Sequence, residues 1–243
     1  MEIKGSVVLI TGAAERVGRA VALYLAERGA HIVFSYYDAK EDWENTLAEI
    51  NALGVSGLAV QTEVRDSKQV HRLVEAAIQQ HGRIDVLINN ASVWLRSPML
   101  EITEEEWDAA LDINLKGPFL MTQAVAPHMI KQEQGVIINM TDLSAFQIWP
   151  GYVHHGASKA GLVSLTRSMA YELSPHIRVN AIAPGTVLLP DNAPPEKRQW
   201  AIEMSTLKRV GTPTDVARLA AYLIESDFVT GSVNFVDGGR SLV

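Results

Sequence analysis

The residues that follow the first apolar run of the chain suit the binding of a pyrophosphate. Gly12 and Gly18 stand in the segment 11–18, between a run of strand length and a segment of helical period. Glycine lets the backbone turn sharply and approach a phosphate, and a helix that begins there supplies free N–H groups and the positive end of its dipole. Two glycines placed at a strand–helix junction indicate dinucleotide binding.

Strand-like and helix-like segments alternate along the chain and predict the framework around this turn. Seven short apolar runs are typical of strands buried on both faces of a parallel sheet; they are 7–10, 32–34, 58–60, 86–88, 136–138, 179–182 and 233–236. Segments of helical period lie between most of them, at 19–28, 41–53, 70–80, 104–121 and 157–173. This order predicts an α/β fold, a single doubly wound Rossmann-type domain over 1–243, with helices on both faces of about seven parallel strands.

One irregular segment interrupts this alternation late in the chain. Prolines stand at 184, 190, 194 and 195, which is too many for a helix interior, and they follow a predicted strand. In open α/β sheets, long loops after the carboxyl ends of strands build the ligand crevice. We therefore expect a substrate-covering loop at about 184–200; a surface loop without that role is the alternative.

The composition excludes several classes of function. The 243 residues are 47% hydrophobic and carry a net charge of −7 with no basic stripe, so neither nucleic acid nor an anionic membrane is an expected partner. The chain has no cysteine, which excludes disulfides and thiolate metal sites, and no metal-ligand cluster is visible. No apolar run approaches the ~20 residues of a membrane span, and the first residues do not read as a signal or transit peptide. We expect a soluble cytoplasmic protein with a small-molecule substrate.

Several motifs come in the order and spacing of the short-chain dehydrogenase/reductase family, which the chain resembles over essentially its whole length. They are the turn 11–18, Asn89–Ser92, Asn114, Ala157–Lys159, Pro184-Gly185 and 236–239. The resemblance implies hydride transfer with a nicotinamide cofactor, a homotetramer or homodimer, a lysine (Lys159) that holds the cofactor ribose, and a proton relay supported by Asn114. The cofactor contacts that it implies are Gly12, Arg16, Val17, Gly18, Tyr36, Glu63, Val64, Asn90, Ala91, Ser92, Lys159, Pro184, Gly185 and Val187.

Three residues resemble the pteridine reductase branch of that family. Arg16 stands where most members carry the middle glycine of the turn, and Asp142 stands where most carry a catalytic serine. Trp94 stands where that branch carries an aromatic ring that stacks a pterin, although a core or interface aromatic is the alternative. The segment 180–195 also resembles that branch, in its length and in its Asp-x-x-Pro ending. The resemblance implies a pterin substrate in contact with Trp94, Asp142 and Leu188.

The chain departs from the family at the residue that delivers the proton. The catalytic tyrosine of the family lies four residues before its lysine, and here His155 holds that position before Lys159. Only the imidazolium form of a histidine is a useful acid; Lys159 and an oxidised nicotinamide disfavour that form, whereas Asp142 favours it. We expect Asp142 and His155 to form an acid pair, with Tyr152 as a second candidate donor. Lost or redirected activity is the alternative.

Two signals conflict over the cofactor. Asp38 lies 20 residues beyond Gly18, where the general fingerprint places an acid on the ribose 2′-hydroxyl and implies NAD. In the family register that acid falls at or before Tyr36, so Asp38 belongs to the next loop, while Arg16 and Lys40 favour a 2′-phosphate. We therefore expect NADP (NADPH), with NAD as the alternative.

These observations favour NADPH-dependent reduction of a small pterin-like or carbonyl substrate. A 3-oxoacyl or other carbonyl reductase of the same family is the first alternative. The second is a nucleotide-binding protein without redox activity that lost the catalytic tyrosine.

Overall fold

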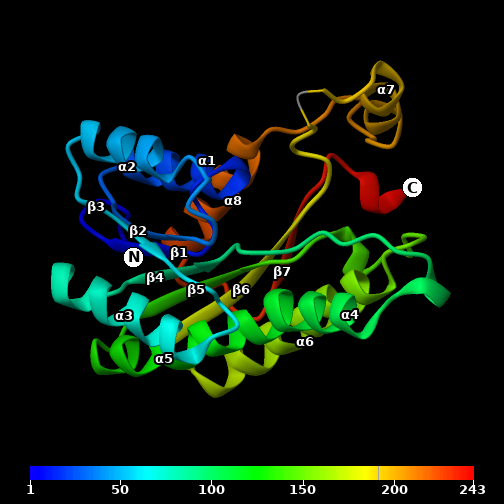
Figure 1. The fold of residues 1–243 in the computed structure, drawn as a ribbon. Coiled ribbons are helices and arrows are strands. Elements are labelled where there is room, and N and C mark those ends of the chain that lie inside the picture. Colours follow the sequence, from blue (N-terminus) through cyan, green and yellow to red (C-terminus); the bar gives the residue numbers. More distant parts are fainter. Residues whose placement is uncertain (191) are drawn as a thin grey trace.

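Seven parallel strands form one sheet in the computed structural model, which describes residues 1–190 and 192–243 (Figure 1). The strands are β1 (Val7–Ile10), β2 (His31–Tyr36), β3 (Gly57–Gln61), β4 (Val86–Asn89), β5 (Gly135–Met140), β6 (Ile177–Pro184) and β7 (Val233–Val236). Their order, β3-β2-β1-β4-β5-β6-β7, reverses direction between β1 and β4. In such a sheet a ligand crevice lies beyond the carboxyl ends of the strands at this reversal.

Helices cover both faces of the sheet, as the alternating pattern predicts. They are α1 (Arg16–Ala26), α2 (Trp43–Ala52), α3 (Ser67–His81), α4 (Glu104–Leu111), α5 (Gly117–Lys131), α6 (Val153–Glu172), α7 (Pro195–Glu203) and α8 (Pro213–Glu225). In Figure 1, α1, α2 and α8 lie on one face, and α3, α4, α5 and α6 lie on the other. The expected fold class is therefore confirmed.

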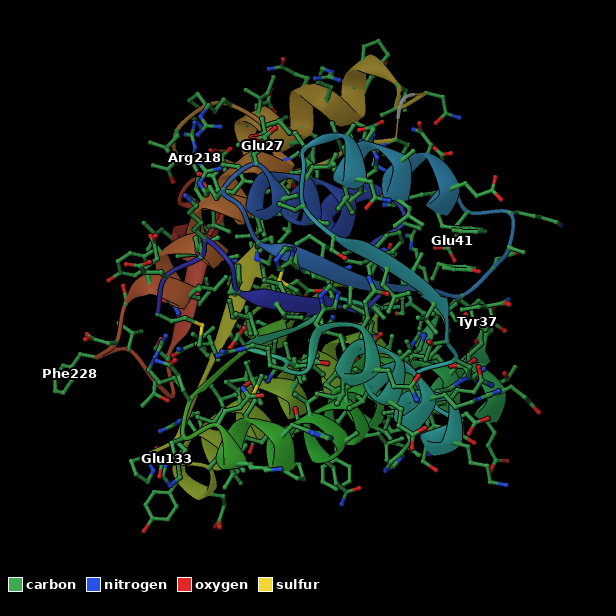
Figure 2. The ribbon with its side chains drawn as sticks, turned by 90° about the vertical axis from the view of Figure 1, so that its left-hand side faces the viewer. Glu27, Tyr37, Glu41, Glu133, Arg218 and Phe228 are labelled. Carbon is green, nitrogen blue, oxygen red and sulfur yellow. The ribbon has the colours of Figure 1, made fainter. Side chains whose placement is uncertain are left out.

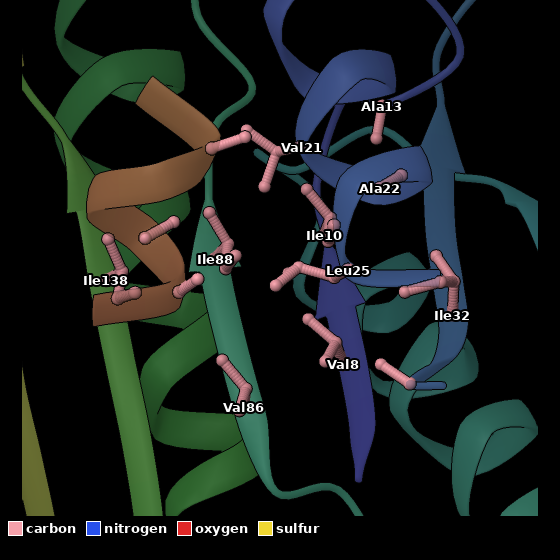
Figure 3. Packing of buried hydrophobic residues seen from close by; sticks show 14 of the residues in the cluster. Val8, Ile10, Ala13, Val21, Ala22, Leu25, Ile32, Val86, Ile88 and Ile138 are labelled. Carbon is pink, nitrogen blue, oxygen red and sulfur yellow. The ribbon is translucent and has the colours of Figure 1, made fainter. Parts of the chain in front are cut away.

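The alternation of side chains along each strand divides the core into two layers. In β1, Val8 and Ile10 pack against α1 and α8, whereas Val7 and Leu9 belong to the layer under α3 and α5. Figure 3 shows the first layer, in which Leu25 of α1 points toward the residues of the central strands. Both layers are apolar, which is why these strands read as continuous hydrophobic runs.

Two predicted elements differ from the structure. The segment 104–121 is not one helix, because a π-helical turn (Asp112–Lys116) separates α4 from α5. The loop expected at about 184–200 ends earlier, since α7 begins at Pro195. A proline is tolerated in the first turn of a helix, where its missing N–H has no partner within the helix, so the proline count misplaced the boundary. Asp191, which begins the Asp-x-x-Pro ending, lies outside the described residues.

None of the helices in the described ranges combines the length and the apolar character that a bilayer crossing requires.

A substitution at Gly185 can test how closely the end of β6 packs against the C-terminal segment. A Cβ atom at this position would lie 2.7 Å from Cα of Asp237 and 3.0 Å from its carbonyl oxygen, and backbone atoms cannot move aside cheaply. We expect Gly185→Ala to lower the free energy of unfolding by about 1–3 kcal/mol, measured by urea denaturation. Gly211→Ala is the matched control, because its nearest neighbour is the Val187 side chain at 3.1 Å. Equal losses in the two variants would contradict the close packing.

Candidate active site

The glycine turn after β1 is tied to the end of β4. Gly12 has a φ of 63°, and a Cβ on Gly18 would lie 2.5 Å from the Gly12 carbonyl oxygen and 2.6 Å from Nδ2 of Asn90. Asn90 Nδ2 donates hydrogen bonds to the carbonyl oxygens of Thr11 (3.0 Å) and Gly12 (2.8 Å). Thr11 Oγ1 accepts the N–H groups of Asn90 and Ala91, each at 3.0 Å. Only glycine fits at position 18, and the two strand ends form one rigid rim.

The first turn of α1 is open to an anion. Glu15, at the N-cap position, makes no side-chain hydrogen bond to the first turn of the helix. The N–H groups of that turn have no partner within the helix, and they lie at the positive end of its dipole. Together with the close approach that Gly12 and Gly18 permit, this arrangement fits the pyrophosphate of a dinucleotide.

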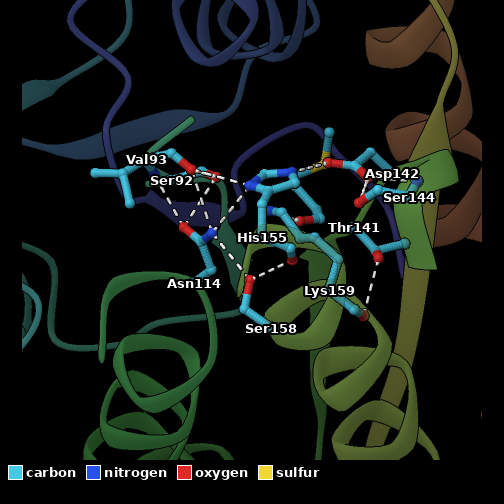
Figure 4. Close-up of polar contacts among 10 residues, drawn as sticks. Ser92, Val93, Asn114, Thr141, Asp142, Ser144, His155, Ser158 and Lys159 are labelled. Carbon is cyan, nitrogen blue, oxygen red and sulfur yellow. Dashed lines mark hydrogen bonds and ion pairs between the residues drawn. The ribbon is translucent and has the colours of Figure 1, made fainter. Parts of the chain in front are cut away.

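His155 lies at the centre of a buried polar network at the other side of the crevice (Figure 4). Its Nε2 lies 2.7 Å from Oδ2 of Asp142. Its Nδ1 lies 3.2 Å from the Val93 carbonyl oxygen and 3.4 Å from Nδ2 of Asn114. The imidazolium form donates to the carboxylate and to the carbonyl together. The neutral ring instead keeps the Nε2 proton for Asp142 and accepts from Asn114 at Nδ1.

Asp142 is held as a carboxylate. Burial raises its pKa, but the hydrogen bond from His155, the charge of Lys159 and the hydrogen bond from Ser144 together bring the pKa below its ordinary value. Ser144 donates to Oδ1 from its backbone N–H at 2.8 Å and from its hydroxyl. Because Asp142 is ionised at neutral pH and accepts in all of these contacts, it is suited to stabilise an imidazolium rather than to donate a proton itself.

Lys159 lies one helical turn beyond His155 on α6 and is also buried. Burial lowers its pKa, and the Asp142 charge opposes that effect in part. Its ammonium group donates one hydrogen bond, at 2.9 Å, to the carbonyl oxygen of Met140 at the end of β5. An ammonium has three donors, so two remain for a ligand such as a ribose.

Asn114 sits on the π-helical turn between α4 and α5 and joins three segments. Its Oδ1 accepts from Ser92 Oγ (3.0 Å) and from the N–H of Val93 (2.9 Å). Its Nδ2 donates to Ser158 Oγ at 3.1 Å and approaches His155 Nδ1. Single π-helical turns are frequent at functional sites. Here the turn brings Asn114 against the imidazole, and its expected relay to the lysine stays a prediction.

Aromatic rings surround the imidazole. The Trp94 ring centre lies 4.7 Å from that of His155 and 5.2 Å from that of Tyr152. Trp94 is 55% exposed whereas His155 is 0% exposed, so the indole covers the histidine from the solvent side. Tyr152 stands at the N-cap of α6 with its ring centre 6.2 Å from that of His155. The sequence missed Trp149, 5.3 Å from Trp94, because it lies in an irregular segment without periodicity.

The other predicted cofactor residues lie along the same edge of the sheet, and all but Ser92 lie apart from this network. Tyr36 ends β2 and stacks on Trp43 with ring centres 4.9 Å apart. The Glu63 carboxylate, just after β3, pairs with Arg65 at 2.7 Å, and Val64 is buried. Ser92 and Arg16 are exposed and Val17 is half-buried, while Ala91 follows Asn90 on the rim.

The predicted site residues at the end of β6 and just after it differ in how deeply they are buried. Pro184 ends β6, and Gly185 lies against Asp237. Val187 is buried in the core layer that also holds α1 and α8, whereas Leu188 is half-buried. No group of three or more metal-ligating side chains occurs in residues 1–190 and 192–243.

Comparisons with known proteins agree with this geometry. A family model described as enoyl-(acyl carrier protein) reductase matches residues 12–241. A 3-oxoacyl-[acyl-carrier-protein] reductase of Thermotoga maritima is 38% identical over 244 residues, covering 98% of this chain and 99% of the relative.

Two solved structures match almost the whole chain as well. A short-chain dehydrogenase/reductase variant of Serratia marcescens superposes with a TM-score of 0.93 at 28% identity, covering 99% of this chain and 100% of that one. A 7α-hydroxysteroid dehydrogenase in complex with NADH and 7-oxo glycochenodeoxycholic acid superposes with a TM-score of 0.93 at 31% identity, covering 98% and 95% of the two chains. The fold, the glycine turn and these similarities together show that the chain belongs to the short-chain dehydrogenase/reductase family of oxidoreductases.

Proposed function

We propose that this protein reduces a carbonyl compound with a nicotinamide cofactor and uses the His155 imidazolium as its proton donor. The observation that carries the proposal is the buried 2.7 Å contact between His155 Nε2 and Asp142 Oδ2, one helical turn from Lys159. The relatives support an oxo substrate, since one is named as a 3-oxoacyl reductase and another was solved with a 7-oxo compound. They favour the carbonyl alternative over the pterin.

The residues of this chain divide the reaction between them. When bound, the reduced cofactor supplies hydride to the carbonyl carbon. The two remaining donors of Lys159 hold the ribose, and the Gly12–Gly18 turn holds the pyrophosphate. The Nε2 proton of His155 passes to the substrate oxygen as negative charge develops on it, and Asp142 remains ionised beside the ring. This leaves the ring neutral, with its proton on Nδ1 against the Val93 carbonyl oxygen, until Nε2 takes up a proton again before the next turnover.

The burial of this polar network argues against a purely structural or nucleotide-sensing role. A buried ion pair costs desolvation energy, and it adds little stability over an apolar pair of the same volume. His155, Asp142 and Lys159 are all buried together at the crevice. Catalysis accounts for this arrangement better than packing does.

Substrate access requires movement of Trp94. His155 has no exposed surface, and the half-exposed indole is the neighbouring ring that faces the solvent. We propose that Trp94 turns away from His155 and stacks on the entering substrate. Because an indole stacks well on a flat conjugated ring, a pterin is the second candidate substrate. Turnover of 7,8-dihydrobiopterin without turnover of acetoacetyl thioesters would favour it.

NADPH is the proposed cofactor. β2 ends at Tyr36, so Asp38 lies outside the strand, and its carboxylate accepts the N–H of Lys40 at 3.0 Å. Arg16 is exposed at the start of α1, where its guanidinium suits a 2′-phosphate. Figure 2 shows Tyr37 and Glu41 in the segment that follows β2, where the Glu41 carboxylate accepts the Tyr37 N–H at 2.8 Å.

A homodimer or homotetramer is the proposed assembly. Trp107 of α4 and Phe119 of α5 expose 39% and 44% of their surfaces. A hollow of about 520 Å³ beside Phe119 is also lined by Leu115 of the π-helical turn and by Leu165 of α6. These apolar side chains suit contact with a second copy of the chain. The cytoplasm remains the expected compartment.

The proton donor is tested by replacing His155. We expect His155→Phe to lower kcat/KM for a ketone by about 10²–10⁴-fold, the usual contribution of a general acid, while the Kd for NADPH changes little. In the unmodified enzyme, kcat/KM is expected to fall at alkaline pH, because carbonyl reduction consumes a proton that the donor must supply. His155→Tyr is expected to move that decline to higher pH, because a phenol holds its proton more tightly.

The exposed His71 provides the control, since His71→Phe is expected to leave the rate and its pH profile unchanged. A His155→Phe variant with full activity would refute the assignment of the proton donor.

The cofactor preference is tested at Arg16. We expect Arg16→Ala to raise the Kd for NADPH by about 10–100-fold, because a charge-assisted contact to the 2′-phosphate is lost. The Kd for NADH should change much less. Arg28→Ala is the control: the Kd values for NADPH and NADH should both change little in this variant, because the Arg28 side chain lies over the Tyr24 ring. Fluorescence titration of the nicotinamide measures all four constants. A parallel loss for both cofactors would overturn the assignment.

The buried pair is tested without substrate through stability at acid pH. The pKa of Asp142 is lowered in the folded protein, so its ionised form contributes stability that is present above the ordinary pKa of ~3.9 and lost as the pH falls through the folded-state value. We expect Asp142→Asn to flatten the decline in the free energy of unfolding between about pH 5 and pH 2. Asp108→Asn, at an exposed site, is the control. An unchanged slope for Asp142→Asn would contradict the pairing.

A further inference from the structure

Arg240 lies in the short C-terminal turn Arg240–Leu242, and the reaction described above does not use it. The turn is fixed by Asp237, whose carboxylate accepts the N–H of Gly239 at 2.9 Å and that of Ser241 at 2.7 Å. Gly238 and Gly239 have φ values of 62° and 78°. The motif that follows β7 therefore serves to place Arg240 at a defined position beside α7 (Figure 1).

The guanidinium of Arg240 bridges three segments of the crevice. Its Nη1 donates to Thr186 Oγ1, beyond β6, at 2.7 Å. Its Cζ lies 4.8 Å from the ring centre of Trp200 on α7 and 5.3 Å from that of Trp149. Its Nε is buried, and no hydrogen-bond partner for it occurs among the described residues.

This guanidinium belongs to the same crevice as the acid–base network. The Trp149 ring beside it contacts Trp94, and Trp94 contacts His155. Burial lowers the pKa of Arg240, and the charges of Asp237 and Asp142 oppose that effect only in part. The contacting rings of Trp149 and Trp94 thus link Arg240 to His155.

The remaining edge of the guanidinium has a defined chemistry. With Nη1 occupied by Thr186, the Nε–Nη2 edge presents two parallel N–H donors, the geometry that binds a carboxylate at both oxygens. A buried donor without an acceptor is unfavourable, and an anionic ligand relieves it. Trp200 is 45% exposed, so its rotation opens this edge.

We propose that Arg240 binds a carboxylate of the substrate and thereby selects carbonyl compounds that carry one. This inference rests on the proposed carbonyl reduction and names its substrate class: a ketone with a carboxylate several bonds from the carbonyl and a flat or aromatic group that packs on Trp94 and Trp149.

The test compares 4-oxo-4-phenylbutanoate with its methyl ester as substrates, with NADPH at saturation. We expect kcat/KM for the acid to exceed that for the ester by at least about tenfold. In Arg240→Gln the ratio should fall to near one, and in Arg240→Lys it should fall only in part. Arg218→Gln, on α8 at the surface labelled in Figure 2, should keep the full ratio. A ratio near one in the unmodified enzyme, or one unaffected by Arg240→Gln, would overturn the inference.

A binding measurement separates this inference from the proposed reaction. 4-Phenylbutanoate has the carboxylate but no carbonyl, and its binding is followed by quenching of tryptophan fluorescence. Binding that weakens at least tenfold in Arg240→Gln, without reduction of any ketone, supports the carboxylate site and rejects the reaction. Reduction of ketones with equal binding of 4-phenylbutanoate in both proteins supports the reaction and rejects the carboxylate site. If Arg240 only braces the two tryptophans, Arg240→Gln lowers Tm and affects acid and ester equally, which also rejects the site.

Discussion

The buried contact between His155 Nε2 and Asp142 Oδ2 is the interaction on which the candidate site depends. Removal of either partner leaves a charged or polar group enclosed without its counterpart, which is costly in a low-dielectric environment. The surrounding contacts fix both partners: Ser144 holds the carboxylate, and Asn114 with Val93 holds the far side of the ring. The network specifies one orientation of the imidazole, which in the proposed reaction sets where a substrate oxygen accepts the proton.

The sheet topology explains how such distant residues meet. Asp142 follows β5, Val93 lies beyond β4, and His155 stands on the helix between β5 and β6, so their positions are set by neighbouring parallel strands. The crevice then joins two groups with different tasks. The glycine turn at the end of β1 suits a phosphate, and the network beyond β5 suits proton transfer. The tryptophans and Arg240 lie together on the side at which we propose that a substrate enters.

Much of this arrangement was predictable from the sequence, because strands and helices carry their own periodicity. Asp142 and His155 are also 13 residues apart, which is the spacing that the family uses between its two catalytic positions. The π-helical turn was not predictable, since the helical pattern of 104–121 continues through it and only the tertiary contacts of Asn114 distinguish it. Trp149 and Arg240 lie in irregular segments and acquire their roles from contacts across the crevice. The residues of the pterin comparison, Arg16, Asp142 and Trp94, do lie on the crevice rim or in the network. The oxo compounds in the names of two relatives are the reason that we propose a carbonyl substrate instead.

Direct observation of the imidazole protons tests the central claim most sharply. In ¹⁵N-histidine NMR spectra recorded from pH 5 to 9, with His155→Phe used to assign the signals, we predict that Nε2 of His155 stays protonated throughout because Asp142 accepts its hydrogen. Nδ1 should carry a proton where it donates to the Val93 carbonyl and be bare where it accepts from the Asn114 amide. In the free enzyme, without cofactor or substrate, a neutral ring with its proton on Nδ1 and a bare Nε2 facing Asp142 would contradict the account.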